Sequence, residues 1–267
     1  PDWSASVVET GATVDNLQRM ARGQLDIGLV TTSSLYHAYN GVAAFDGRQI
    51  ESKLLWAYSL APQAVIVRQD SGVESIPELD GTRMGAGQRG SSTEATSEAV
   101  MELFGVEPDW VRGTNSELAN AIKDNRAIGF IKSLVGTEFD ALTTDIATFT
   151  PVRVLGITDE QRAMLQENLP ELSIVDVPAR DEFGRDTDFQ TWGFMIAVSA
   201  RPDMDEETAY RITKSVMEAQ EEQAAAFATI GDTDLIALTL NYATSPLHPG
   251  AIRYFEEAGY TVPDRLR

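Results

Sequence analysis

"SIPELDGTRMGAGQRGSSTEAT", residues 75–96, passes from a turn into a strand and then into a helix. Pro77 and the Asp80-Gly81 pair mark the turn, and a short apolar run follows them. The helix is predicted to begin near Ser91, because apolar residues then recur at helical spacing: Ala95, Ala99, Val100 and Leu103. A strand, a glycine-rich turn and a helix in this order form the basic unit of α/β proteins.

The same alternation continues along the chain. Strands are predicted from apolar runs at residues 6–10, 26–32, 64–68, 127–131 and 152–158. Helices are predicted around residues 118–122, 205–230, 233–242 and 249–258. Together these patterns predict an α/β fold with mostly parallel sheets.

Two polar, turn-rich segments suggest crossings between two lobes, one near 68–84 and the other near 183–193. If both are hinges, residues 1–80 and 193–267 form a discontinuous first lobe, and residues 84–185 form the second. A small ligand would then bind in the cleft between the lobes.

The charge balance weighs against two classes of partner. The chain has 41 acidic and 21 basic side chains and a net charge of −20, which disfavours nucleic acid and anionic membranes. The lack of cysteine excludes disulfides and thiolate chemistry but fits both reducing and oxidising compartments. No apolar run is long enough to span a membrane. The chain starts at Pro1 without a signal peptide, which indicates processing or truncation.

The glycine-rich turn at residues 85–90 is the strongest candidate for ligand binding. Free amides in the first turn of the next helix, near Ser91, Ser92 and Thr93, would favour a carboxylate or phosphate. Arg89 would add a positive charge beside them. A capped helix after a tight turn explains the same residues equally well. The stretch matches neither a P-loop nor a dinucleotide-binding fingerprint.

Other candidates lie at the ends of predicted elements. In "TTSSLYHAYNG" (31–41), Thr31, Thr32 or Ser33 would hydrogen-bond a ligand and Tyr36 would form a wall, although a capped surface helix is an equal alternative. Lys132 ends a predicted strand, and Trp192 lies at the second crossing. The simpler interpretation of Lys132 is a solvated lysine. The simpler interpretation of Trp192 is an aromatic side chain that only fills space at the hinge.

The sequence offers no catalytic or metal-binding motif. His37 and His248 are the two histidines, and neither has neighbours that assign it the role of a base or a metal ligand. Pro249 is placed to start the last helix, so His248 is expected to cap or pack in that turn. No catalytic residue, metal or cofactor is therefore predicted.

Three stretches resemble the TAXI family, the TRAP-associated extracytoplasmic immunogenic solute receptors. They are "ETGATVDNLQRMARGQLDIGLVTTSSLYHAYNG" (9–41), "SIPELDGTRMGAGQRGSST" (75–93) and "SPLHPGAIRYFEEAGY" (245–260), and they occur in the family's order. The family's usual opening strand, with its Gly-rich segment followed by two tyrosines, has no match here. The resemblance therefore implies that an N-terminal segment is missing.

The resemblance implies a monomeric receptor with the type II periplasmic-binding-protein fold, which closes around a small anionic solute. A glutamate-like amino acid or a dicarboxylate would be delivered to the permease subunits of a TRAP transporter. The receptor would be periplasmic or otherwise extracytoplasmic, either secreted or lipid-anchored. The implied ligand-binding residues are Arg89, Gly90, Ser91, Ser92 and Thr93 on the anion, Thr32, Ser33 and Tyr36 from the other lobe, and also Lys132 and Trp192.

Two alternatives stay open at this point. One is an enzyme of the same fold that acts on a carboxylated substrate, and the other is a ligand-sensing domain of a larger signalling protein.

Overall fold

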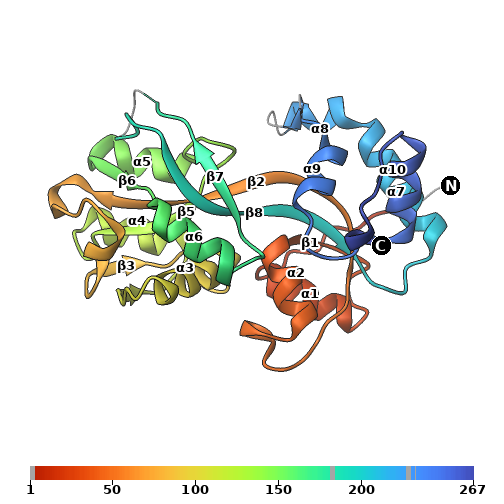
Figure 1. Ribbon diagram of the computed structural model, residues 1–267, viewed down its shortest axis with the longest axis horizontal. Helices are drawn as coiled ribbons and strands as arrows, with labels where there is room; N and C mark the ends of the chain where they lie inside the picture. The colour runs from red at the N-terminus through yellow and green to blue at the C-terminus, as the bar shows by residue number, and fades with distance from the viewer. Residues whose placement is uncertain (1–3, 181–183, 227–229, 232) are drawn as a thin grey trace.

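Two long antiparallel strands, β2 (Lys53–Arg68) and β8 (Phe189–Ala200), run through both halves of the molecule (Figure 1). The computed structural model describes residues 4–180, 184–226, 230–231 and 233–267. β2 and β8 pair with each other from Lys53, opposite Ala200, to Pro62, opposite Gly193. Beyond this stretch, β2 pairs with β5 and β6, and β8 pairs with β7. The strand order is β1-β8-β2-β5-β3-β4, with β6 also on β2 and β7 also on β8.

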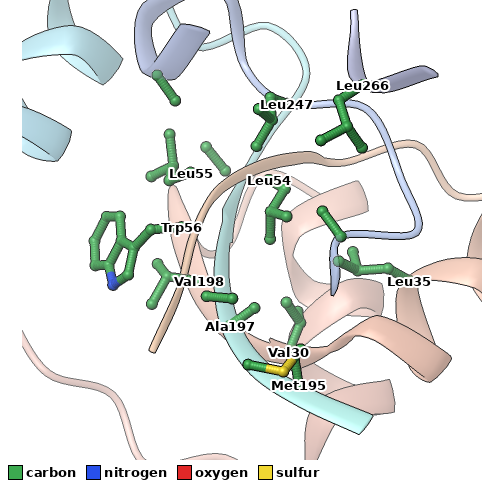
Figure 2. Close-up of a cluster of buried hydrophobic side chains, with 14 of the residues drawn as sticks. Val30, Leu35, Leu54, Leu55, Trp56, Met195, Ala197, Val198, Leu247 and Leu266 are labelled. Atoms are coloured by element: carbon green, nitrogen blue, oxygen red, sulfur yellow. The ribbon is translucent and has the colours of Figure 1, made fainter. Parts of the chain in front are cut away.

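Lobe 1, as defined by these contacts, comprises residues 4–61 and the described residues of 194–267. Its strands are β1 (Ile27–Thr31) and the adjoining parts of β2 and β8. Its helices are α1 (Thr13–Ala21), α2 (Thr32–Asn40), α7 (Glu206–Glu218), α8 (Gln220–Ala226), α9 (Leu235–Tyr242) and α10 (Pro249–Glu257). Figure 2 shows the core that these elements share. In this core, Leu54 of β2 and Met195 of β8 lie near Leu247 and Leu35.

Lobe 2 comprises the described residues of 62–193. Its strands are β3 (Arg83–Gly85), β4 (Asp109–Val111), β5 (Gly129–Ser133), β6 (Val152–Leu155) and β7 (Ser173–Val177), and its helices are α3 (Ser92–Leu103), α4 (Asn115–Lys123), α5 (Ala141–Phe149) and α6 (Asp159–Asn168). Both faces of this sheet are buried. Along β2, Ala64 and Ile66 join one apolar cluster, while Val65 and Val67 join another, as the alternation of side chains in a strand requires.

The α/β class is confirmed, but the prediction of mostly parallel sheets is wrong. Only the pairs β3–β4 and β3–β5 are parallel among the strand pairs of the described residues. β2 and β8 run in opposite directions through both lobes and pair antiparallel with almost every neighbour. The alternation of strands and helices along the sequence does not show that two strands run through both lobes and pair with strands far away in the sequence.

The first crossing lies earlier in the chain than residues 68–84. β2 leaves the lobe 1 sheet at Pro62 and pairs with β5 from Gln63 onward, so the chain changes lobes inside a strand. The predicted hinge segment instead belongs to lobe 2, because Val73, Ile76 and Leu79 pack into its core. The return crossing lies at the end of the expected range 183–193, where β8 exchanges β7 for β2.

Two predicted elements differ from the structure. Residues 6–10 form no strand, and Val7 there is 99% exposed. The helix predicted over residues 205–230 is divided into α7 and α8, with the break at Ala219. The side-chain amide of Gln220 donates to the carbonyls of Ile230 and Thr233, 2.7 Å from each, which fixes the chain at this break. Residues 227–229 lie outside the described residues.

No helix in the described part of the chain is long and apolar enough to cross a bilayer.

His248 caps the last helix. Its Nδ1 accepts a hydrogen bond from the amide of Gly250 at 3.2 Å, and its Nε2 donates to the carbonyl of Met204 at 3.0 Å. Pro249 occupies the first helical position, where its missing N–H costs nothing. The prediction that His248 caps this turn is therefore confirmed.

Replacing His248 with alanine is expected to lower the free energy of unfolding by about 1–3 kcal/mol, since a helix cap and a buried hydrogen bond are lost. Burial lowers the pKa of His248 below its usual value of 6.5, so the unfolded chain takes up the proton first. The stability that depends on neutral His248 is thus complete above about pH 6.5 and is lost as the pH falls through the lowered pKa. Urea unfolding of both proteins between pH 5 and 8 tests this, and parallel pH profiles would contradict it.

Candidate functional site

The N-termini of two helices, one from each lobe, meet between the lobes. Thr31 caps α2, its Oγ1 accepting from the amide of Ser34 at 3.1 Å. Ser91 caps α3, its Oγ accepting from the amide of Glu94 at 3.2 Å. The hydroxyls of Thr31 and Ser92 lie 2.7 Å apart and join the two helix starts directly.

This arrangement brings unpaired backbone donors together. The amides of Thr32 and Ser33 in α2, and of Ser92 and Thr93 in α3, precede any helical carbonyl to which they could donate. The positive ends of both helix dipoles lie at the same place. Such donors favour an anion or a cluster of acceptor oxygens.

Hydroxyl and amide side chains extend the site to both crossing strands. Thr13 Oγ1 lies 3.0 Å from Ser92 Oγ, and Thr93 Oγ1 lies 3.0 Å from Ser133 Oγ. Ser133 in turn accepts from the side-chain amide of Gln63, which is fully buried in β2, at 3.0 Å. Thr191 of β8 donates to the carbonyl of Gln63. A continuous polar network therefore links the start of α3 to the strands that join the lobes.

The glycine-rich turn holds a carboxylate of the protein itself. Glu94 Oε2 accepts from the amide of Gly90 at 2.6 Å, and its Oε1 accepts from Arg112 at 2.7 Å. Gly87 has φ 125°, and a Cβ there would lie 2.7 Å from Thr93 Cγ2, so this turn requires glycine. Because Glu94 occupies the loop amide, the donors left for a ligand are those of the first helical turn.

The lobes are closed over this site. The cavity beside the helix starts has a volume of about 20 Å³, enough for one water molecule. Its lining comes from both lobes and includes Ser33, His37, Ser91 and Ser92. His37 of α2 also contacts Glu171 of lobe 2, with 3.1 Å between Nε2 and Oε1.

A second, larger groove of about 290 Å³ also lies between the lobes. Its lining is mainly apolar and includes Tyr58 and Leu60 from β2, Val175 from β7 and Leu238 from α9. Burial raises the pKa of Tyr58, so its phenol stays neutral at physiological pH. This groove has the size of a small-molecule pocket but lacks the converging amides of the helix starts.

The structure gathers only part of the predicted site. Ser33, Ser91, Ser92 and Thr93 surround the meeting helix starts, as does Thr32, whose Oγ1 also accepts from the amide of Met195 at 3.1 Å.

Tyr36 is half-buried one turn further along α2, edge-on to the ring of His37. Arg89 and Gly90 are exposed in the turn before α3. Lys132 is paired with Asp140 at 2.9 Å. Trp192 is fully buried in the core of lobe 2, which favours the packing interpretation of this residue.

Four residues of the site were not predicted from the sequence, namely Thr13, Gln63, Ser133 and Glu171. Gln63 had a recognisable signal, because it is the one polar side chain in the otherwise apolar run at 60–67. Thr13, Ser133 and Glu171 lie far apart in the sequence and are brought together only by the closed lobes and the crossing strands.

A family model and one solved structure with a TM-score above 0.5 match most of this chain. The model of the NMT1-like family matches residues 2–259. XAC2383 from Xanthomonas citri, solved bound to ATP, is 13% identical with a TM-score of 0.55, covering 94% of this chain and 82% of that chain. The GluR0 ligand-binding core from Nostoc punctiforme, solved in complex with L-glutamate, is 11% identical with a TM-score of 0.48, covering 86% of this chain and 82% of that chain. Identities this low concern the fold alone.

Proposed function

Because this chain belongs to the NMT1-like family and has the type II periplasmic-binding-protein fold, we propose that it captures a small carboxylated solute between its lobes. The observation that carries the proposal is the meeting of two helix N-termini from opposite lobes, joined at Thr31 and Ser92. The cavity there has room for one water molecule, so the lobes must part to admit a carboxylate. The carboxylate would then accept from the amides of both helices and so hold the two lobes together.

The charge around the site favours one carboxylate over a polyanion. The donors at the helix starts are neutral amides and hydroxyls. Two nearby cations are already paired, Arg112 with Glu94 and Lys132 with Asp140. A glutamate-like amino acid or a dicarboxylate fits if its second charged group lies near the edge of the cleft, within reach of the exposed Arg89.

Delivery to a TRAP-type permease in an extracytoplasmic compartment is the transport role we propose. It is supported by the three ordered stretches that resemble the TAXI receptors, at 9–41, 75–93 and 245–260. The lobes would open by bending β2 and β8 near Pro62 and Gly193, where these two strands leave each other.

An enzyme acting on a carboxylated substrate is the second candidate, since His37, in contact with Glu171, lines the same cavity as Ser91 and Ser92. The contacts of these serines favour binding over catalysis. Ser92 Oγ contacts Thr31 and Thr13, and Ser91 Oγ caps α3, so both hydroxyls are engaged away from the imidazole.

A ligand screen tests the proposal. We expect glutamate, dicarboxylates or monocarboxylates to raise the melting temperature, and the matching uncharged amides and ATP not to do so. A ligand at about 100 times its Kd adds ~2.7 kcal/mol of stability. Mass spectrometry should recover that ligand unchanged, whereas a product would support the enzyme. If no carboxylate stabilises the protein, the proposal is wrong.

A further inference from the structure

We propose that His37 and Glu171 form a latch that holds the two lobes closed beside the solute site. The inference rests on the proposed opening and closing of the lobes. His37 lies in α2 of lobe 1, and Glu171 lies in the turn between α6 and β7 of lobe 2. Their side chains meet across the boundary between the lobes, with 3.1 Å between Nε2 and Oε1.

The contact is largely buried in this arrangement of the lobes. The side chain of Glu171 is 5% exposed and that of His37 is 14% exposed. A carboxylate withdrawn from water requires a hydrogen-bond donor, and the donor here comes from the opposite lobe. When the lobes part, each group loses this partner and regains water. The contact therefore forms in one state of the hinge and breaks in the other.

The position of the pair connects it to the solute. His37 lines the small cavity together with Ser33, Ser91 and Ser92, so one member of the pair forms part of the cavity wall. This cavity has room for one water molecule, so a solute reaches the helix starts only after this contact has opened. His37 and Glu171 are positioning residues in this role, because they act on the lobes and not on the solute.

Both lobes are acidic, so closure brings like charges together. Residues 62–193 carry 23 acidic and 11 basic side chains, and the rest of the chain carries 18 and 10. Net charges of the same sign oppose close approach of the lobes. A hydrogen bond to a buried carboxylate is among the stronger polar contacts, and this one opposes that repulsion at the boundary.

The absence of cysteine allows a test that needs no solute. Cysteines placed at the exposed positions Glu51 in lobe 1 and Glu102 in lobe 2 would carry one spin label each. Electron–electron distance measurements then report the populations of closed and open protein. With His37 and Glu171 intact, we expect a dominant short distance. Glu171→Ala or His37→Ala should shift the ratio of closed to open protein about tenfold toward the longer distance.

The controls separate a latch from a general loss of structure. Glu167→Ala removes an exposed carboxylate near the end of α6 and should leave the distances unchanged. The double variant His37→Ala/Glu171→Ala should shift the populations no further than either single variant, since one contact is lost in all three. If Glu171→Ala does not fold, His37→Ala tests the same contact from the other lobe.

Unchanged distances in both single variants, or additive shifts in the double variant, would overturn the latch. Either result leaves the proposed solute binding intact, because the ligand screen tests that function with the unmodified chain.

Discussion

Replacing Gly250 with alanine is expected to lower the free energy of unfolding by about 3 kcal/mol or more, the upper end for overpacked sites. Gly250 is buried where α10 crosses α7, and a Cβ there would lie 2.4 Å from both Glu206 O and Tyr210 N. These are backbone atoms of α7, so they cannot move aside as a flexible side chain would. The two helices would have to separate, and lobe 1 would lose part of its core.

Thermal unfolding measures this effect, because about 3 kcal/mol corresponds to a fall in Tm of at least ~6 °C for a chain of this size. Gly11→Ala is the matched control. Gly11 is exposed, and its Cβ would meet Asp15 at 3.8 Å, an ordinary contact, so we expect an unchanged Tm. Equal melting temperatures for Gly250→Ala and the unmodified chain would show that the two helices do not approach this closely.

The second large effect is expected at Ser92, where Ser92→Phe should weaken solute binding at least ~100-fold, a loss of about 2.7 kcal/mol. Ser92 is 8% exposed between the lobes, and the adjacent cavity of about 20 Å³ cannot accept an aromatic ring. The ring would hold the lobes apart and separate the two helix starts. The Tm of the free protein should change little, because Ser92 lies at the boundary where the two helix starts meet.

Ser92→Ala is the control, since it removes the hydroxyl and keeps the amide and the space. Its affinity should fall by no more than ~10-fold, the range for one lost hydrogen bond. Calorimetric titration with the best carboxylate from the ligand screen distinguishes the two variants. If Ser92→Phe binds that ligand as tightly as the unmodified chain, the site does not lie at the helix starts.

Local patterns predicted the helix starts well. Ser91 was predicted to begin a helix from the glycines before it and the apolar spacing after it, and the structure caps α3 at that residue. The turn around His248 was predicted from Pro249 in the same way. In both places a few neighbouring residues determine the backbone, so the sequence contains the necessary information.

Long-range pairing was not predictable in this way. Only residues 64–68 of β2 were expected, because Ser59 and Pro62 interrupt the apolar run, yet the strand extends back to Lys53 through pairing with β8. β8 lies more than a hundred residues from the part of β2 with which it pairs, and local periodicity contains no information on such a partner. The boundary between the lobes was misplaced for the same reason, since it lies inside this strand.

For the candidate site too, the local features were predictable from the sequence and the long-range contacts were not. Thr32, Ser33, Ser92 and Thr93 were found because each follows a predicted strand or glycine-rich turn. Their convergence required the fold, and so did the contact between His37 and Glu171. Lys132 was selected only because it ends a strand, but the sequence could not show that Asp140 pairs with it.

The continuity of β2 and β8 also determines how the protein should unfold. Each strand contributes side chains to the cores of both lobes, as Leu54 and Val65 show for β2. Neither lobe can lose its sheet without disrupting strands that the other shares, so melting should be one cooperative transition of the whole chain. A solute that binds at the boundary would then raise the stability of regions far from it, including the packed helices α7 and α10.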